Sequence, residues 1–181
     1  MYFTLADLIT DIAQNAYESG AGLLKLDVEE DSSSLCFSVQ DNGKGMNNEE
    51  LRRAIDPFFS DGMKHPQRKV GLGIPFFIQT AEQSGGGWDI RSSTGEGTSA
   101  SAWFDTGNVD TPPLGDLPET FRTMLMLEVP EVIIRRSKLL DGKEGLDYQL
   151  CKTELSEVLG DLMETGSQVL LDQYLRSLEN E

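Results

Sequence analysis

Two polar side chains near the start of the chain stand four positions apart, Asp11 and Asn15. On a helix this spacing brings both side chains to the same face, one turn apart. A carboxylate beside a carboxamide can orient a water molecule or a hydroxyl group and can supply an oxygen to Mg²⁺, a hard cation that prefers oxygen ligands. Taken alone, the pair is also compatible with two solvated polar residues, which is the simpler interpretation.

A further carboxylate, Asp41, comes directly after a segment in which apolar and polar residues alternate, and Gly43 and Gly45 follow it. The alternation over residues 35–40 predicts a strand with one buried face. A carboxylate at a strand end provides a hydrogen-bond acceptor, and the two glycines allow the backbone to approach a flat ligand closely. An ordinary β-turn has a similar composition, so this motif alone does not decide between a binding site and a turn.

The segment Gly71-Leu72-Gly73 stands at the start of a predicted helix. Free backbone N–H groups and the positive end of the helix dipole make such a helix start a binding site for anions. Four basic residues come just before it: Lys64, His65, Arg68 and Lys69. They form either a solvated loop or a loop that meets a polyanion. Neither glycine motif matches a Walker A loop or a dinucleotide-binding fingerprint.

Hydrophobic periodicity predicts the elements that position these motifs. Helices are expected at residues 6–18, 48–55 and 74–84, and strands at 23–29, 35–40, 88–92 and 98–104. Thr4 and Asp7 form a capping-box pattern at the first helix. The order of helices and strands indicates an α+β fold. We therefore expect a two-layer α/β sandwich in which the helices cover one face of a mixed sheet.

A change of composition divides the chain after this pattern. Residues 109–118 contain Gly, Pro, Asp and Thr and predict a linker between a domain at 1–108 and a small appendage at 119–181. The expected elements of this C-terminal part are a helix at 117–128, strands at 132–139 and 146–150, and helices at 154–162 and 168–178. It has no glycine-rich loop, no convergent acids and no reactive pair, so its expected role is to bind a protein partner.

Charge and composition exclude several classes of protein. The net charge is −16, from 31 acidic and 15 basic residues, which disfavours non-specific binding to nucleic acid or to an anionic membrane. No apolar run approaches the roughly 18 to 20 residues of a membrane helix, so we expect a cytoplasmic protein. Two cysteines and one histidine fit reduced thiols and argue against a structural zinc site.

Taken together, the motifs occur in one order: Asp11-x-x-x-Asn15, Asp41-x-Gly43-x-Gly45, Pro57-Phe58-Phe59, Gly71-Leu72-Gly73 and Gly97-Thr98. This order resembles the GHKL superfamily, whose ATP-binding Bergerat fold is shared by gyrase-type topoisomerases, mismatch-repair ATPases, ninety-kilodalton chaperones and histidine kinases. The resemblance covers residues 4–105. The phrases DIAQNAYESGA, DNGKGM, DPFFSDG and KVGLGIPF are most similar to those of stand-alone histidine kinase-like ATPases.

The resemblance implies how the adenine base of ATP is bound. Asp41 is expected to accept a hydrogen bond from the exocyclic amine of adenine, with support from Thr98. Gly43, Gly45 and Met46 are expected to line the base pocket.

The resemblance also implies how the phosphates are bound. Asn15 is expected to hold Mg²⁺, which bridges the phosphates, and the segment Gly71-Leu72-Gly73 is expected to present backbone N–H groups to them. Residues 60–70 are expected to form a lid, in which Lys69 either contacts phosphate or is solvated.

Asp11 occupies the place of the catalytic base in this resemblance, but ATP-hydrolysing members of the superfamily usually carry glutamate there. Aspartate keeps the carboxylate on a side chain that is one methylene shorter. A base displaced by ~1 Å can lose much of its effect. Binding of ATP is therefore better supported than its hydrolysis.

The function expected from the resemblance is that of a Mg-ATP-binding ATPase or protein kinase in intracellular signalling, without a phosphoacceptor domain of its own. The alternative is a non-catalytic sensor of ATP and ADP, or a regulatory binding module. A scaffold that has lost ATP binding is the third interpretation. The oligomeric state is left open, with a homodimer as one option.

Overall fold

One mixed sheet organises the chain. The computed structural model describes residues 4–56, 73–140 and 143–179. The sheet has the strand order β3-β4-β2-β1-β5-β6, in which β1 and β5 are parallel and all other neighbours are antiparallel. The strands are β1 (Leu23–Glu30), β2 (Ser34–Asp41), β3 (Gly87–Ser93), β4 (Gly97–Asp105), β5 (Glu131–Leu140) and β6 (Lys143–Cys151).

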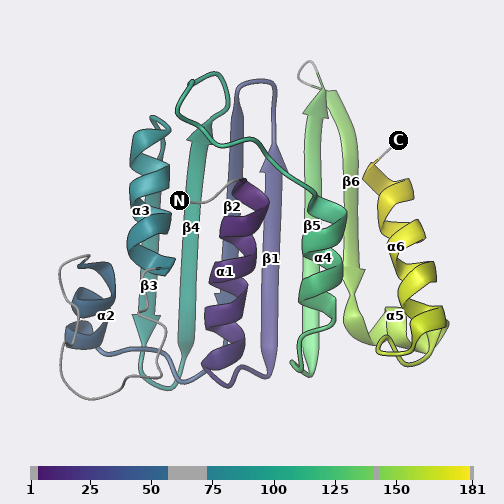
Figure 1. Cartoon of the computed structure of the whole chain (residues 1–181). Coiled ribbons are helices and arrows are strands. Elements are labelled where there is room, and N and C mark those ends of the chain that lie inside the picture. The colour runs from purple at the N-terminus through teal and green to yellow at the C-terminus, as the bar shows by residue number, and fades with distance from the viewer. Residues whose placement is uncertain (1–3, 57–72, 141–142, 180–181) are drawn as a thin grey trace.

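Helices form the second layer. Figure 1 shows α1, α3 and α4 lying side by side on one face of the sheet, with α6 next to α4. The helices are α1 (Leu5–Glu18), α2 (Asn48–Ile55), α3 (Gly73–Gln83), α4 (Leu117–Leu125), α5 (Lys152–Leu159) and α6 (Thr165–Glu179). The predicted α+β class is therefore confirmed. No helix in the described part of the chain is long and apolar enough to cross a membrane.

The local sequence explains where α1 begins. The Thr4 hydroxyl accepts a hydrogen bond from the backbone N–H of Asp7 at 3.1 Å, and the Asp7 carboxylate accepts one from the N–H of Thr4 at 3.0 Å. This predicted capping box is confirmed. It satisfies two polar groups that would otherwise lack partners at the start of a helix.

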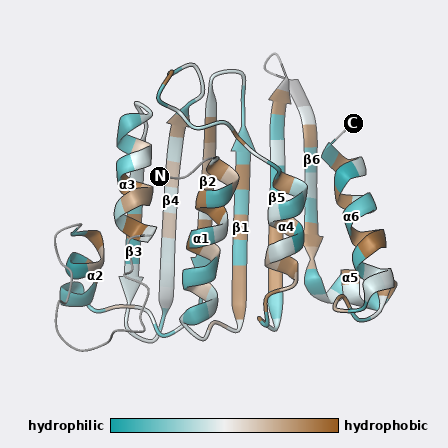
Figure 2. Ribbon diagram, in the orientation of Figure 1, coloured by the Kyte–Doolittle hydropathy of each residue, from teal (hydrophilic) through white to brown (hydrophobic). Residues whose placement is uncertain are grey.

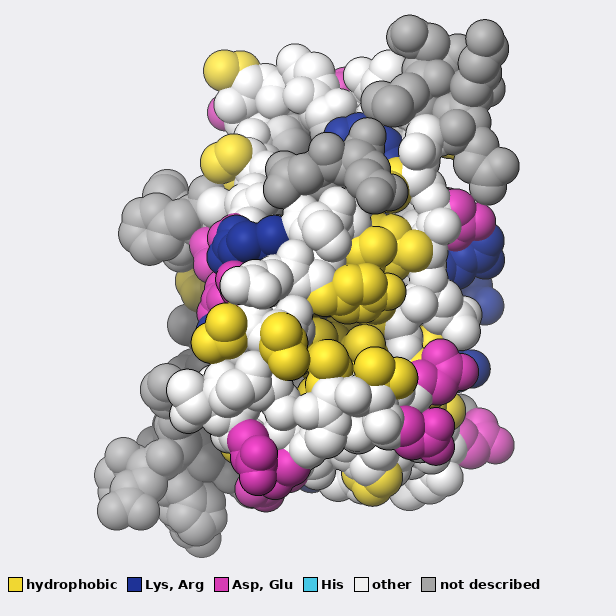
Figure 3. Space-filling model, turned by 90° about the vertical axis from the view of Figure 1, so that its right-hand side faces the viewer, with side chains coloured by type: hydrophobic (Ala, Val, Ile, Leu, Met, Phe, Trp, Pro, Cys, Tyr) yellow, Lys and Arg dark blue, Asp and Glu magenta, His cyan; other side chains and the backbone are white. Residues whose placement is uncertain are grey.

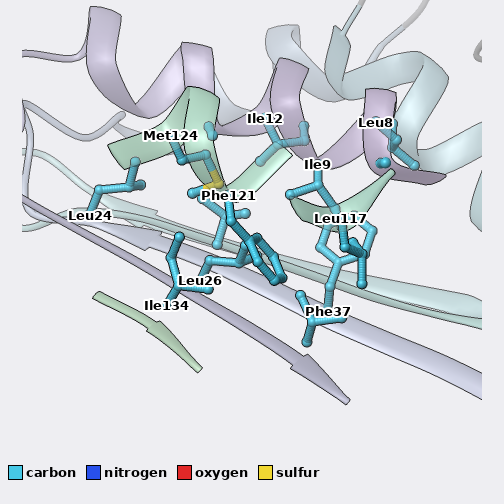
Figure 4. Close-up of a cluster of buried hydrophobic side chains, with 14 of the residues drawn as sticks. Leu8, Ile9, Ile12, Leu24, Leu26, Phe37, Leu117, Phe121, Met124 and Ile134 are labelled. Carbon is cyan, nitrogen blue, oxygen red and sulfur yellow. The ribbon is translucent and has the colours of Figure 1, made fainter. Parts of the chain in front are cut away.

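The core lies between the helix layer and the sheet. Alternate residues of β1 and β2 are buried, as the period of two in the sequence predicts, and the ring of Phe37 packs 5.8 Å from Phe77 and 5.7 Å from Phe104. Figure 2 shows apolar residues both in the helices of this layer and in the strands behind them. Figure 4 shows that Leu117, Phe121 and Met124 of α4 enter the same cluster as the side chains of α1, β1 and β2.

The C-terminal elements occur in the predicted order, α4-β5-β6-α5-α6, and β5 and β6 extend the same sheet as β1 to β4. Two boundaries differ from the prediction. The helix expected at residues 117–128 ends at Leu125, because Met126 is its C-cap. The final two helices begin two and three residues before their expected starts, at Lys152 and Thr165.

A buried arginine joins the last helix to the sheet. The Arg136 side chain on β5 is 1% exposed and forms ion pairs with Glu30 of β1 and with Glu179 of α6. Tyr148 of β6 donates a hydrogen bond to the same Glu179 carboxylate at 2.6 Å, and Lys138 pairs with Glu30 at 3.0 Å. Buried charges of this kind are tolerated because each is paired and hydrogen-bonded.

We expect Arg136→Met to lower the free energy of unfolding by about 3 kcal/mol, since it leaves two partly buried carboxylates without their arginine partner. Chemical denaturation measures this loss. The control is Arg135→Met, one residue earlier on β5, because the Arg135 side chain is 57% exposed and lies 3.6 Å from Asp147. That variant should change stability by less than about 1 kcal/mol, and an equal loss in both variants would contradict the role given to the buried network.

Candidate functional site

Asp41 is held in a fixed orientation at the end of β2. Its Oδ1 atom accepts hydrogen bonds from the hydroxyl of Ser19 at 3.0 Å and from the backbone N–H of Gly43 at 2.8 Å. Ser19 is the C-cap of α1, so these bonds tie the strand end to the helix end. The Oδ2 atom accepts no hydrogen bond from the described residues. One carboxylate oxygen of Asp41 is therefore available to a ligand.

Thr98 lies directly across from Asp41 in the register of β2 and β4. Its hydroxyl is 2.9 Å from the hydroxyl of Ser92 on β3. Ser92 also accepts a hydrogen bond from the backbone N–H of Met46 at 2.8 Å and donates one to the carbonyl of Gly97 at 2.9 Å. Ser92 thus joins the loop after β2 to the β3–β4 hairpin, and it places Met46 beside Thr98.

Two glycines allow the close approach of these backbones. Gly45 has φ +60°, and a Cβ atom there would overlap the carbonyl oxygen of Ser93. Gly97 has φ +100°, and a Cβ atom there would overlap the carbonyl oxygen of Asp41. Both positions combine a left-handed conformation with a backbone contact that leaves no room for a side chain. The glycines at this edge are therefore required by the packing of the loop against the hairpin.

Asp11, Asn15 and Gly73 form a second cluster next to the first. A Cβ atom built on Gly73, at the start of α3, would lie 2.5 Å from Asp11 Oδ2 and 3.3 Å from Asn15 Nδ2. Both side chains therefore lie beside the N-terminal end of α3. Asn15 precedes Ser19 by one turn of α1, about 6 Å along the axis, so a single helix end joins the two clusters.

The structure thus brings together the predicted residues that it describes. Asp41, Gly43, Gly45, Met46 and Thr98 form one cluster, and Asp11, Asn15 and Gly73 form the other. Three further predicted site residues, Lys69, Gly71 and Leu72, lie outside the described residues, as do the predicted lid and the four basic residues.

Three positioning residues were missed by the sequence analysis: Ser19, Asn42 and Ser92. The Asn42 Oδ1 atom accepts hydrogen bonds at 2.8 Å from the backbone N–H groups of Gly22 and Leu23, which join the loop after β2 to the start of β1. A signal for Ser92 was present, because counting back through the predicted hairpin turn pairs it with Thr98. For Ser19, the signal was its place one helical turn after Asn15.

The oxygen atoms at this edge suit a cation that takes most of its coordination from a bound small molecule and from water. No group of three His, Cys, Asp or Glu side chains able to hold a metal occurs in the described ranges. Mg²⁺ in nucleotide sites is commonly held by one or two protein oxygens together with phosphates and water. The exposed carboxamide of Asn15 fits that requirement.

Comparison with known families agrees with this arrangement. The family of histidine kinase-, DNA gyrase B- and HSP90-like ATPases matches residues 3–108, a range that contains both clusters. The chain belongs to this family. The GHKL resemblance expected from the motifs is therefore confirmed for the N-terminal part of the chain, and membership supports binding of ATP.

Individual relatives of this GHKL chain are sensor proteins and kinases. A putative sensor protein from Shewanella frigidimarina is 29% identical over 54% of this chain and 14% of its own length. The sensor histidine kinase YxdK of Bacillus subtilis is 29% identical over 54% of this chain and 31% of its own length. Sporulation kinase C of the same organism is 27% identical over 52% and 22%. The chain spans less than a third of the length of these relatives.

We expect Gly45→Ala to lower the free energy of unfolding by roughly 2–4 kcal/mol, because it adds overpacking against Ser93 to the cost of a left-handed residue. Gly95→Ala is a matched control. Gly95 has φ +82°, but a Cβ atom there meets nothing within 4 Å, so only the backbone cost of about 1–2 kcal/mol remains. Chemical denaturation of both variants measures the difference, and equal losses would show that the contact with Ser93 is not limiting.

Proposed function

We propose that this chain binds Mg·ATP and uses it as an ATPase or protein kinase in cytoplasmic signalling. The single observation that carries the proposal is the Asp41 carboxylate, which has one oxygen held by Ser19 and Gly43 and the other without a hydrogen bond from the described residues. An acceptor that is fixed in this way and lies beside closely packed backbone is suited to reading an exocyclic amine on a flat base.

At the base, Asp41 accepts the hydrogen bond of the adenine amine and Thr98 supports it. Gly43, Gly45 and Met46 provide the wall of the pocket. The hydrogen bond that the Met46 backbone N–H donates to the Ser92 hydroxyl supports this role, because it holds the loop against the hairpin. ADP carries the same base and is expected to bind through the same residues.

At the phosphates, Asn15 would hold Mg²⁺ and Gly73 would present the N-terminal end of α3 to the anionic groups. We also assign phosphate contacts to Gly71, Leu72 and Lys69 in the segment that precedes α3. When bound, Mg²⁺ neutralises the negative charge that is present during phosphoryl transfer. The chain contributes to this binding by holding Asn15 of α1 beside the N-terminal end of α3.

Asp11 is the proposed catalytic group. Its carboxylate lies beside Gly73, and this position supports a role at the proposed phosphate end of the site. From there it can orient or deprotonate the attacking hydroxyl or water. Its shorter side chain, compared with glutamate, predicts slow turnover rather than loss of nucleotide binding.

Asp41→Asn should weaken the binding of both ATP and ADP by about 10- to 100-fold, the usual value of a hydrogen bond to a charged group. Isothermal titration calorimetry measures both affinities. Asp105→Asn is the matched control, because Asp105 also ends a strand and accepts a hydrogen bond from the glycine two residues later, Gly107, at 2.8 Å. Unchanged affinity in Asp41→Asn would favour the scaffold that has lost ATP.

Asp11→Asn should lower the rate of phosphate release or of phosphoryl transfer by about 100-fold or more, the usual contribution of a general base, while leaving ATP affinity within a few-fold of the parent. Single-turnover assays with labelled ATP measure the rate. Asp11→Glu, which keeps a carboxylate at this position, should retain turnover. A parent protein without any turnover would refute the enzymatic function and leave nucleotide sensing.

A non-catalytic sensor is the second candidate, and a specific observation favours a partner-binding role for the C-terminal region. Six large apolar side chains are exposed in the described part of that region: Leu139, Val158, Met163, Val169, Leu170 and Tyr174. Figure 3 shows apolar side chains gathered on the side of the molecule that α6 and β6 form, with charged side chains around them. Exposed apolar surface of this kind is typical of protein interfaces. A homodimer stays a prediction.

A further inference from the structure

A hollow of about 410 Å³ lies on the face of the sheet that is turned away from α1, α3 and α4. Two rows of residues cross β3, β4, β2 and β1 in register and line it. The first row is Gly87, Trp103, Cys36 and Glu29, and the second is Asp89, Ser101, Ser38 and Asp27. We call these eight residues the sheet-face hollow.

The shape of the sheet-face hollow follows from the sizes of its side chains. Small residues on β2 and β4, such as Cys36 and Ser101, form its floor. Trp103 is 47% exposed, and its indole lies against Gly87, where a Cβ atom would be 2.8 Å from Trp103 Nε1. A large aromatic side chain left exposed beside a hollow is a common feature of binding surfaces.

The carboxylates around the sheet-face hollow are only partly balanced by cations. Asp89 pairs with Arg91 at 2.8 Å. Asp27 neighbours Arg135 in the register of β1 and β5, but the ion pair of Arg135 is with Asp147. Among the described residues, no ion pair within 4.0 Å involves Asp27 or Glu29.

The negative charge around the hollow also affects the pKa of a residue on its floor. Burial raises the pKa of the Cys36 thiol, and the carboxylates of Glu29 and Asp31 raise that pKa further. Three carboxylates, of Asp27, Glu29 and Asp89, line the hollow, and only that of Asp89 has an ion pair among the described residues. A ligand that matches both the aromatic wall and these carboxylates carries a cation on an apolar or planar group.

We propose that the sheet-face hollow docks a basic segment of a protein partner, with an arginine side chain set between Trp103 and the carboxylates of Asp27 and Glu29. A guanidinium group stacks on an indole and forms paired hydrogen bonds with carboxylates, which lysine does less well. A second copy of this chain is disfavoured as the occupant, because it would bring three carboxylates of each hollow together.

This docking surface is separate from the proposed nucleotide site. Asp41 and Thr98 lie at the ends of β2 and β4 nearest the β3–β4 turn, whereas the nearest residues of the hollow, Ser38 and Ser101, lie three residues away on the same strands. Three residues of strand span about 10 Å, and the alternation of side chains places Asp41 and Ser38 on opposite faces of the sheet. A partner and a nucleotide can therefore be bound at the same time.

The width of the hollow sets the length of the probe. From β1 to β3 there are three strand spacings, about 14 Å, which corresponds to about four residues of extended chain. The experiment titrates the full chain with acetyl-Arg₄-amide by calorimetry at low salt. The control peptide is acetyl-citrulline₄-amide, which has nearly the same shape and no charge. We expect saturable binding of the arginine peptide alone, weakened by added salt.

Three variants test where the arginine peptide binds. Asp27→Asn combined with Glu29→Gln should weaken the arginine peptide about tenfold, as expected for the loss of two exposed charge pairs. Trp103→Ala should weaken it about three- to fivefold through the lost cation–π contact. Glu154→Gln combined with Glu157→Gln, two exposed carboxylates on α5, changes the net charge equally and should have no effect. Unchanged ADP affinity in each variant confirms that the fold is intact.

Three results would overturn the proposal. The first is equal weakening by the α5 control pair, which would show non-specific attraction to an acidic protein. The second is equal binding of the citrulline peptide, or no saturable binding of the arginine peptide. The third is a dimer in sedimentation analysis that Trp103→Ala dissociates, which would make a second copy the occupant. Because ADP affinity is measured separately, failure here is distinguishable from failure of the nucleotide site.

Discussion

The hydrogen bonds that Asp41 accepts from Ser19 and Gly43 are the contacts on which the rest of the site depends. They join the end of β2 to the end of α1, so the cluster around Asp41 and the cluster around Asn15 become parts of one edge. Without that link, the cluster around Asn15 would be positioned only by packing of the α1 helix. A carboxylate that is anchored through one oxygen can use the other without rotating, which lowers the entropy lost when a ligand is ordered.

Close backbone contacts at the same edge also hold the loop after β2 in a fixed position. Gly45 and Gly97 bring the loop after β2 and the β3–β4 hairpin to separations that side chains would prevent. The hydroxyl of Ser92 then satisfies polar groups on both sides of this contact. Buried polar groups are costly when they are unpaired, so the presence of this serine permits the close packing that the glycines allow.

Much of this arrangement could be predicted from the sequence, because it depends on local patterns. The helix α1, the strands β1 and β2 and the capping box at Thr4 are confirmed. The place of β5 beside β1 could not be predicted, since a parallel pairing between distant segments leaves no local period. Ser19 and Ser92 were missed for a related reason: their partners lie on other elements, and a lone serine in a helix cap or a strand is unremarkable.

The parallel pairing of β1 with β5 also has a consequence for how the protein is made. Leu23 pairs with Glu131, and the register continues to Glu30 and Lys138. Until residues 131–138 have been synthesised, one edge of β1 has no neighbour, and the buried side chains of Val132 and Ile134 are missing from the core. An unpaired strand edge next to exposed apolar surface favours aggregation. The nascent chain therefore passes through a stage in which residues 1–108 are complete but one edge of β1 is unpaired, and assembly of the sheet depends on the late arrival of the C-terminal strands.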